Sequence, residues 1–187
     1  MKRTLTFAMT MLLLTGTLAA CGSSNSVPET QPAPTTTPIS PTPRTEATDG
    51  LPSNVKSALK AGFPLASSFT EQHTKHHDAD LHTYLAFTTA DGKKTTLGAA
   101  TVAEAKGAKY LVAVDNDVKI IKVVVVQSGG NTEVEAETFL SQFVGKTHDD
   151  ALKLGKDIQF TGTDKANAEA LVEAIRHAEQ DLQGLYG

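Results

Sequence analysis

The sequence predicts an α+β domain, an antiparallel sheet with helices packed on it. Two hairpin signals, Asp-Gly at residues 91–92 and Asp-Asn-Asp at residues 115–117, each separate two stretches with strand-like composition. Residues 120–126 are β-branched almost throughout, which favours a central strand. Residues 167–183 instead place their apolar side chains at helical spacing. Local hairpins followed by a helix favour antiparallel pairing and a helix packed on the sheet.

In chain order, the first element is a helix from Ser53, a residue type that caps helices, to Gly62 and Pro64, which end it. The predicted strands are residues 67–73, 81–89, 93–102, 109–114 and 118–127.

Two further helices are predicted in the second half. Thr132 and Glu135 have the spacing of a capping box, and Gly145-Lys146 ends the helix that would follow. Its apolar face would comprise Phe139, Leu140, Phe143 and Val144. A short strand is expected at residues 158–160. The buried stripe of the last helix, residues 167–183, would be Ala168, Leu171, Val172, Ile175, Ala178 and Leu182.

The N-terminus has the organisation of a secretory signal. Lys2 and Arg3 precede an apolar stretch too short for a permanent membrane span, and small residues follow. The sequence Leu-Ala-Ala-Cys at residues 18–21 resembles the bacterial lipobox, in which the cysteine is acylated and becomes the first mature residue. The sequence thus predicts a lipoprotein signal peptide at residues 1–20 and a lipid anchor on Cys21.

Residues 21–52 hold seven of the eight prolines of the chain among Thr and Ser residues. Such a segment cannot bury enough apolar area to offset its ordering entropy. We therefore expect the lipidated Cys21 to begin a disordered linker, and residues 53–187 to form the folded domain. The location would be the extracytoplasmic face of a bacterial envelope, with inner and outer membrane left open.

Composition and motifs exclude some functions. The formal net charge is −4 and no basic run follows the extreme N-terminus, so no nucleic-acid partner is expected. Cys21 is the single cysteine, and no G-x-S-x-G nucleophile motif is present. The sequence therefore carries no hydrolase signature.

Residues 73–82 read HTKHHDADLH, with four histidines and two aspartates. These side chains are metal ligands, but their spacing matches no stereotyped site. An exposed polar loop between strands is the simpler interpretation, and metal capture by this loop remains an alternative.

Residues 160–175, FTGTDKANAEALVEAI, begin a helix whose unpaired N–H groups could receive a phosphate. Asp164 places a carboxylate where the phosphate would sit. The segment is therefore a ligand site, a former ligand site or only a capped helix start.

Three stretches together resemble the FMN-binding domain family, which includes the flavin subunits of the Rnf and sodium-translocating quinone reductase complexes. The strand Val-Ala-Val-Asp at residues 112–115, with Lys119 and Ile120, is similar to the family pattern V-G-I-D-x-D-G-K-I. Residues 139–146, FLSQFVGK, are similar to F-x-x-Q-F-x-G-K, and residues 161–164, TGTD, occupy the place of its Ser-Gly-Ala-Thr turn. The resemblance covers residues 53–187.

The resemblance implies an FMN site at the start of the last helix, held by Thr161, Gly162, Thr163, Asp164, Lys165 and Asn167. In the family the last residue of the Ser-Gly-Ala-Thr turn can be esterified to the FMN phosphate. Here that position holds Asp164 or, in a second alignment, Lys165. Non-covalent FMN is therefore expected rather than covalent FMN, with no flavin as the alternative, and Tyr84 or Tyr110 could stack on the ring.

Two functions follow from the resemblance. The first is a flavin-holding electron-transfer component with a redox partner protein. The second is a domain of the same fold that has lost flavin and serves as a binding or interaction module.

Overall fold

The computed structural model describes residues 50–76 and 79–186, with side chains described outside residues 74–80. The predicted signal peptide, Cys21 and most of the predicted linker lie outside the described residues. Within the described part, no helix is both long and apolar enough to cross a membrane.

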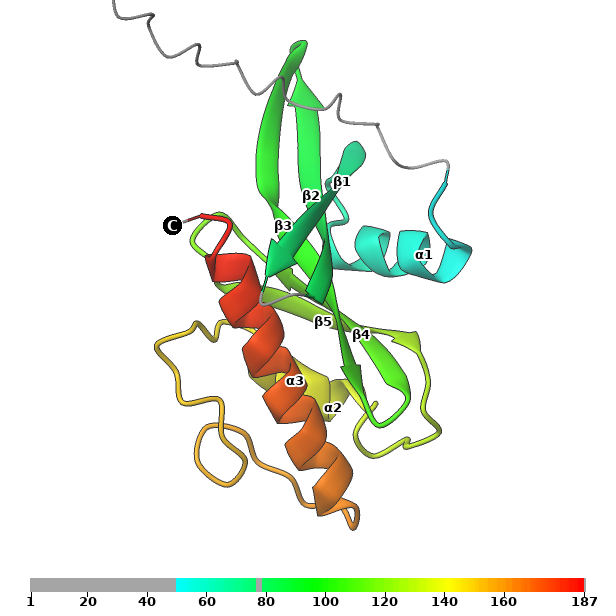
Figure 1. Ribbon diagram of the computed structural model, residues 1–187, viewed down its shortest axis with the longest axis vertical. Coiled ribbons are helices and arrows are strands. Elements are labelled where there is room, and N and C mark those ends of the chain that lie inside the picture. The colour runs from blue at the N-terminus through cyan, green and yellow to red at the C-terminus, as the bar shows by residue number, and fades with distance from the viewer. Residues whose placement is uncertain (1–49, 77–78, 187) are drawn as a thin grey trace, which may run out of the picture. The chain divides into compact units, whose positions relative to one another are not determined.

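The centre of the domain is a five-stranded antiparallel sheet in which each strand pairs with its neighbours in sequence, in the order β1-β2-β3-β4-β5 (Figure 1). The strands are β1 (Ser68–His76), β2 (Ala79–Ala90), β3 (Lys93–Ala105), β4 (Ala108–Val114) and β5 (Ile120–Gln127). The predicted α+β class is therefore confirmed.

Two tight turns set the order of the central strands. Asp91 and Gly92 between β2 and β3 have φ values of 51° and 74°, and Lys106 and Gly107 between β3 and β4 have 49° and 81°. Positive φ at both central residues matches the twist of hairpin strands, and Gly and Asp adopt it readily. The predicted Asp91-Gly92 hairpin is confirmed.

Helix α1 (Ser53–Gly62) and helix α3 (Lys165–Gln183) pack on opposite faces of the sheet (Figure 1). Ser53 is the first residue of α1 rather than its cap, because Pro52 occupies the N-cap position and no side chain caps this helix. Helix α3 begins two residues before the predicted start. Its predicted apolar stripe is buried throughout.

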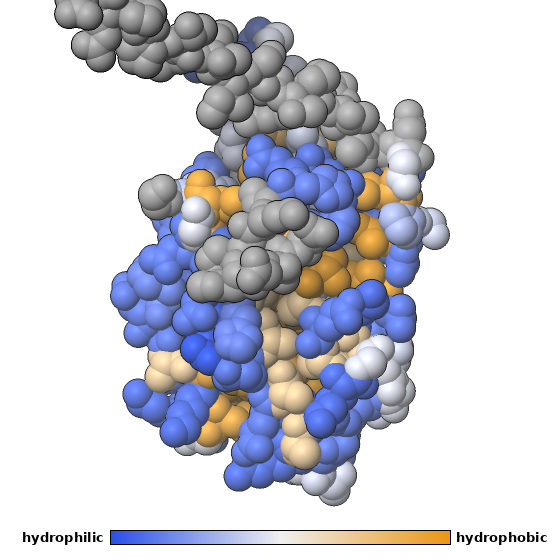
Figure 2. Space-filling view, viewed as in Figure 1, coloured by the Kyte–Doolittle hydropathy of each residue, from blue (hydrophilic) through white to orange (hydrophobic). Residues whose placement is uncertain are grey.

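The two helix-covered faces form two cores. Strand β4 contributes to both, since Leu111 and Ala113 face α1 while Tyr110, Val112 and Val114 face α3. The core under α1 also contains Val55, Leu59, Phe63, Phe69 and Tyr84. The core under α3 also contains Ile120, Val134, Phe139, Phe143, Ile158, Leu171, Val172 and Ile175. On the face that Figure 2 presents, hydrophilic residues surround smaller hydrophobic areas, as expected of a sheet covered by helices.

The predicted helix at residues 132–146 is wrong in length. The structure forms only helix α2 (Glu137–Leu140) and the 3-10 turn η1 (Ser141–Phe143). Glu135 does not complete a capping box, because its carboxylate accepts hydrogen bonds from Ser128 Oγ and Gly129 N, both at 2.7 Å. Val144 then turns to extended backbone and leaves the predicted face, with 46% of its surface exposed.

The predicted strand at residues 158–160 is also wrong. Ile158 makes one isolated bridge to Leu154 and is buried under α3, but no strand is assigned there. Ile158 is apolar because it fills the core. A buried residue in an irregular loop therefore produced a pattern that resembled a short strand.

Candidate functional site

Four of the six predicted flavin-binding residues directly precede α3, and the other two, Lys165 and Asn167, lie in its first turn. Asp164 is the N-cap residue. Its Oδ1 accepts the Asn167 N–H at 3.1 Å, and its Oδ2 accepts hydrogen bonds from Asn167 Nδ2 at 2.7 Å and Asn131 Nδ2 at 2.9 Å. One carboxylate therefore satisfies a helix amide and joins α3 to the loop after β5.

A second carboxylate, that of Glu133, lies in front of the same helix end. Its Oε2 accepts hydrogen bonds from Thr163 N at 2.8 Å, Thr163 Oγ1 at 3.2 Å and Asp164 N at 3.4 Å. These are the backbone and hydroxyl donors that the resemblance assigns to a phosphate. The chain itself thus supplies an anion to this turn.

Local packing explains why position 162 is a glycine. A Cβ atom at this position would lie 2.5 Å from the Phe160 ring and 2.6 Å from Glu133 Oε2. The absent side chain therefore makes room for the Glu133 carboxylate.

The remaining predicted residues do not converge on a ligand. Thr161 is exposed, and the Nζ of Lys165 lies 3.6 Å from Glu169 Oε1 on the outside of α3. The cavity that Asn167 lines with Gly129 and Asn131 has a volume of about 10 Å³, the size of a single water site.

The two tyrosines proposed to stack on a flavin are both buried, on opposite faces of the sheet. Burial raises the pKa of Tyr84 and the pKa of Tyr110 to about 12. Tyr110 lines the small cavity beside Asn167 but is packed in the core, and Tyr84 lies in the core under α1, so neither ring offers a free stacking surface.

The largest of the described grooves lies on the opposite side of the sheet from α3. It has a volume of about 500 Å³ and lies between the first turn of α1 and the sheet. Its walls include Asn54, His82, Tyr84, Val102, Glu104, Lys109 and Gln127. Mixed apolar and polar walls of this kind are typical of ligand pockets.

The described residues of the His-rich segment lie in strands and not in a loop, which corrects the prediction. Residues 73–76 belong to β1 and residues 79–82 to β2, and His73 pairs directly with His82 across the two strands. Glu71 Oε1 lies 2.7 Å from His82 Nδ1 and 3.8 Å from His73 Nε2. Strand pairing therefore gathers two of the histidines around a glutamate that the sequence pattern did not single out.

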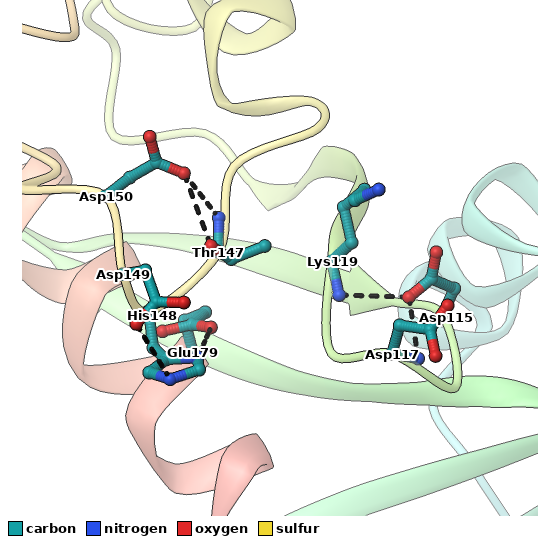
Figure 3. Close-up of polar contacts among 8 residues, drawn as sticks. All are labelled: Asp115, Asp117, Lys119, Thr147, His148, Asp149, Asp150 and Glu179. Atoms are coloured by element: carbon teal, nitrogen blue, oxygen red, sulfur yellow. Dashed lines mark hydrogen bonds and ion pairs between the residues drawn. The ribbon is translucent and has the colours of Figure 1, made fainter. Parts of the chain in front are cut away.

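Sequence reasoning also missed Glu179, a fully buried carboxylate on α3. Figure 3 shows it beside His148 in the loop before α3, with Glu179 Oε1 3.9 Å from His148 Nδ1. Within the described residues, neither Glu179 oxygen makes a hydrogen bond. Burial raises the pKa of Glu179, and a positive charge on His148 opposes this rise.

The turn between β4 and β5 is held by Asp115, whose Oδ1 accepts hydrogen bonds from Asp117 N at 3.0 Å and Lys119 N at 2.9 Å (Figure 3). Val118 in this turn has a φ of 55°, which is unusual for a β-branched residue. The family pattern quoted above has glycine at this position.

No protein-family model matches the chain, and no curated protein matches it significantly.

Proposed function

We propose that this protein is a membrane-anchored extracytoplasmic lipoprotein whose domain is a binding module of the FMN-binding type that works without flavin. The observation that carries this proposal is the position of Glu133, whose carboxylate accepts the Thr163 N–H, the Thr163 hydroxyl and the Asp164 N–H. The anchor rests on the lipobox-like residues 18–21 and Cys21.

A phosphate at this turn would have to displace Glu133 and approach Asp164. At 4 Å each carboxylate repels a unit negative charge by about 1 kcal/mol in bulk water and by about 4 kcal/mol near a protein surface. Lys165 offers little compensation, since its amine lies beside Glu169. Both carboxylates also satisfy donors at the helix start, so their removal would cost stability as well.

The groove beside the first turn of α1 is the proposed binding surface of this module. It is the most voluminous of the described grooves, and it combines apolar Val102 with charged Glu104 and Lys109. Such mixed walls suit a ligand that has both apolar and polar groups.

A flavin-holding electron-transfer component, with non-covalent FMN and a redox partner protein, is the second candidate. The β4–β5 turn favours it, because Val118 has the left-handed backbone that the glycine of the family pattern would adopt without strain. This supports the family resemblance without identifying a ligand.

Titration of the purified full chain with FMN tests the proposal. We expect no shift of flavin absorbance near about 450 nm and no quenching of flavin fluorescence. We expect the same result for Glu133→Gln and for the control Glu169→Gln, an exposed carboxylate one turn into α3.

A yellow protein, or saturable quenching by the unsubstituted chain, would contradict the flavin-free proposal and support the second candidate. In that case Glu133→Gln should bind FMN more tightly than Glu169→Gln, because only Glu133 lies at the phosphate position.

A further inference from the structure

The antiparallel register of β1 and β2 brings three metal-ligating side chains to one place on the face of the sheet that α1 covers. Glu71 and His73 are two residues apart on β1 and therefore project from the same face. His82 lies directly opposite His73 on β2. The core residues Phe69 and Tyr84, which flank this group on the two strands, identify the face as that of α1.

The donor atoms of these side chains are close enough to share an ion. One ligand atom from each residue lies within 4.8 Å of the other two, and the two imidazole ring centres are 4.4 Å apart. A tetrahedral ion with bonds of about 2.0–2.2 Å requires donors about 3.4 Å apart. The 2.7 Å between His82 Nδ1 and Glu71 Oε1 and the 3.8 Å between His73 Nε2 and Glu71 Oε1 differ from this by less than 1 Å.

The three side chains differ in exposure, as expected of a metal site that is open to solvent on one side. The Glu71 side chain is 18% exposed, whereas those of His73 and His82 are 61% and 50% exposed. Tyr84 is buried and lies directly opposite Glu71 on β2, at the inner end of the cluster. Burial raises the pKa of Tyr84, and the Glu71 carboxylate raises it further. A phenol beside a ligating carboxylate is the kind of neighbour that orients a metal ligand.

We propose that Glu71, His73 and His82 form a binding site for a divalent transition-metal cation. Two imidazoles and one carboxylate suit Zn²⁺ and its neighbours in the first transition row, whereas Ca²⁺ and Mg²⁺ prefer oxygen ligands. On binding, the cation takes the position between His82 Nδ1 and Glu71 Oε1, which lie 2.7 Å apart, and a proton held between them is released to water. Three protein ligands leave a coordination position open, and His82 also lines the groove beside α1.

Competition between the purified full chain and a chromophoric chelator for Zn²⁺ tests this site. We expect His73→Gln and His82→Gln each to weaken Zn²⁺ binding by about 10-fold or more, by loss of one ligand. His177→Gln is the matched control. His177 also lies 3.2 Å from a glutamate, Glu173, but this pair contains one histidine where the proposed site contains two. A second control, the double variant His76→Gln/His77→Gln, separates this site from a general effect of the His-rich composition.

Unchanged affinity in His73→Gln or in His82→Gln would overturn the proposal, and so would an equal loss in His177→Gln or in the His76/His77 variant. A second measurement needs no substitution and so does not depend on variant folding. Zn²⁺ should protect His73 and His82, but not His177, from carbethoxylation mapped by mass spectrometry. Equal modification of the three histidines with and without Zn²⁺ would also overturn the proposal. Neither outcome depends on whether the chain binds FMN.

Discussion

At the scale of single residues, Glu179 is the clearest departure from ordinary protein chemistry. A carboxylate with no exposed surface is expensive to keep charged, and the basic group beside it, the His148 imidazole, lies 3.9 Å away in a loop. Asp149 and Asp150 in the same loop add negative charge and raise the pKa of Glu179 further. The fold therefore favours the protonated form of this side chain.

The sign of the resulting pH dependence follows from the raised pKa of Glu179. The folded state holds the Glu179 proton more tightly than the unfolded state. The stability that this proton contributes is therefore fully present below the unfolded pKa and is lost as pH rises through the folded pKa. Each unit by which the folded pKa exceeds the unfolded pKa corresponds to about 1.4 kcal/mol. Glu179→Gln should therefore raise the free energy of unfolding at pH 8, well above the unfolded pKa, and flatten its decline as pH rises above that pKa.

Urea denaturation at a series of pH values measures this effect. Glu173→Gln is the control on the same helix, because Arg176 lowers the pKa of the exposed Glu173. Its carboxylate contributes stability above its unfolded pKa, so its substitution should not stabilise the protein at pH 8. A stabilisation of equal size in both variants would contradict a specific role for burial at Glu179.

At the scale of elements, the predictions that succeeded rest on local signals. The turn at Asp91-Gly92 and the β-branched composition of β5 are local signals, and the apolar stripe of the 19-residue helix α3 repeats at helical spacing. The helix predicted at residues 132–146 failed because Glu135 bonds to Ser128 and Gly129 instead of capping a helix. That competition depends on the path of a loop, which local pattern does not determine.

The candidate sites depend on contacts between elements and were therefore less predictable. Glu133 is 30 residues from Thr163, and the His73–His82 pair arises from hairpin register. Sequence composition marked both regions, the start of α3 and the His-rich segment. It indicated the Asp164 carboxylate at the start of α3, but not that Glu133 would also bind there, nor that Glu71 would join the histidines.

The bulge between β2 and β3 gives a prediction at this scale. Ala86 pairs with Gly98 and Phe87 with Thr96, so the register shifts by one residue on β3. Gly98 has a φ of 152°, and a Cβ there would lie 2.0 Å from the Val114 carbonyl oxygen of β4. Since neither backbone can yield without breaking the ladder, Gly98→Ala should cost about 3 kcal/mol or more.

The matched control for this prediction is Gly162→Ala. Its Cβ would meet the Phe160 ring and the Glu133 carboxylate, which are the ends of side chains that can turn aside. We expect a cost of about 1 kcal/mol, with the secondary structure retained. Equal losses of unfolding free energy in the two variants, measured by urea denaturation, would show that the close approach of β3 and β4 is not what requires Gly98.

At the scale of the whole domain, the two cores share strand β4. Successive β4 residues alternate between the core under α1 and the core under α3. Loss of packing in either core therefore exposes one face of β4. Residues 50–76 and 79–186 should therefore unfold as one cooperative unit. The alternative, local release of α1 with the α3 core intact, would require β4 to expose Leu111 and Ala113 to water.

The tyrosines allow this last prediction to be tested, since the chain has no tryptophan. Tyr84 lies in the core under α1 and Tyr110 in the core under α3, whereas Tyr186 is partly exposed near the C-terminus and common to both variants. In Tyr110→Phe the buried fluorescence therefore reports on the α1 core, and in Tyr84→Phe on the α3 core. We expect the urea midpoint from fluorescence to coincide with that from far-UV circular dichroism in each variant, because loss of either core removes one face of β4. If the fluorescence of Tyr110→Phe changes at a lower urea concentration than its circular dichroism while the two probes agree in Tyr84→Phe, α1 unfolds first and the cores are independent.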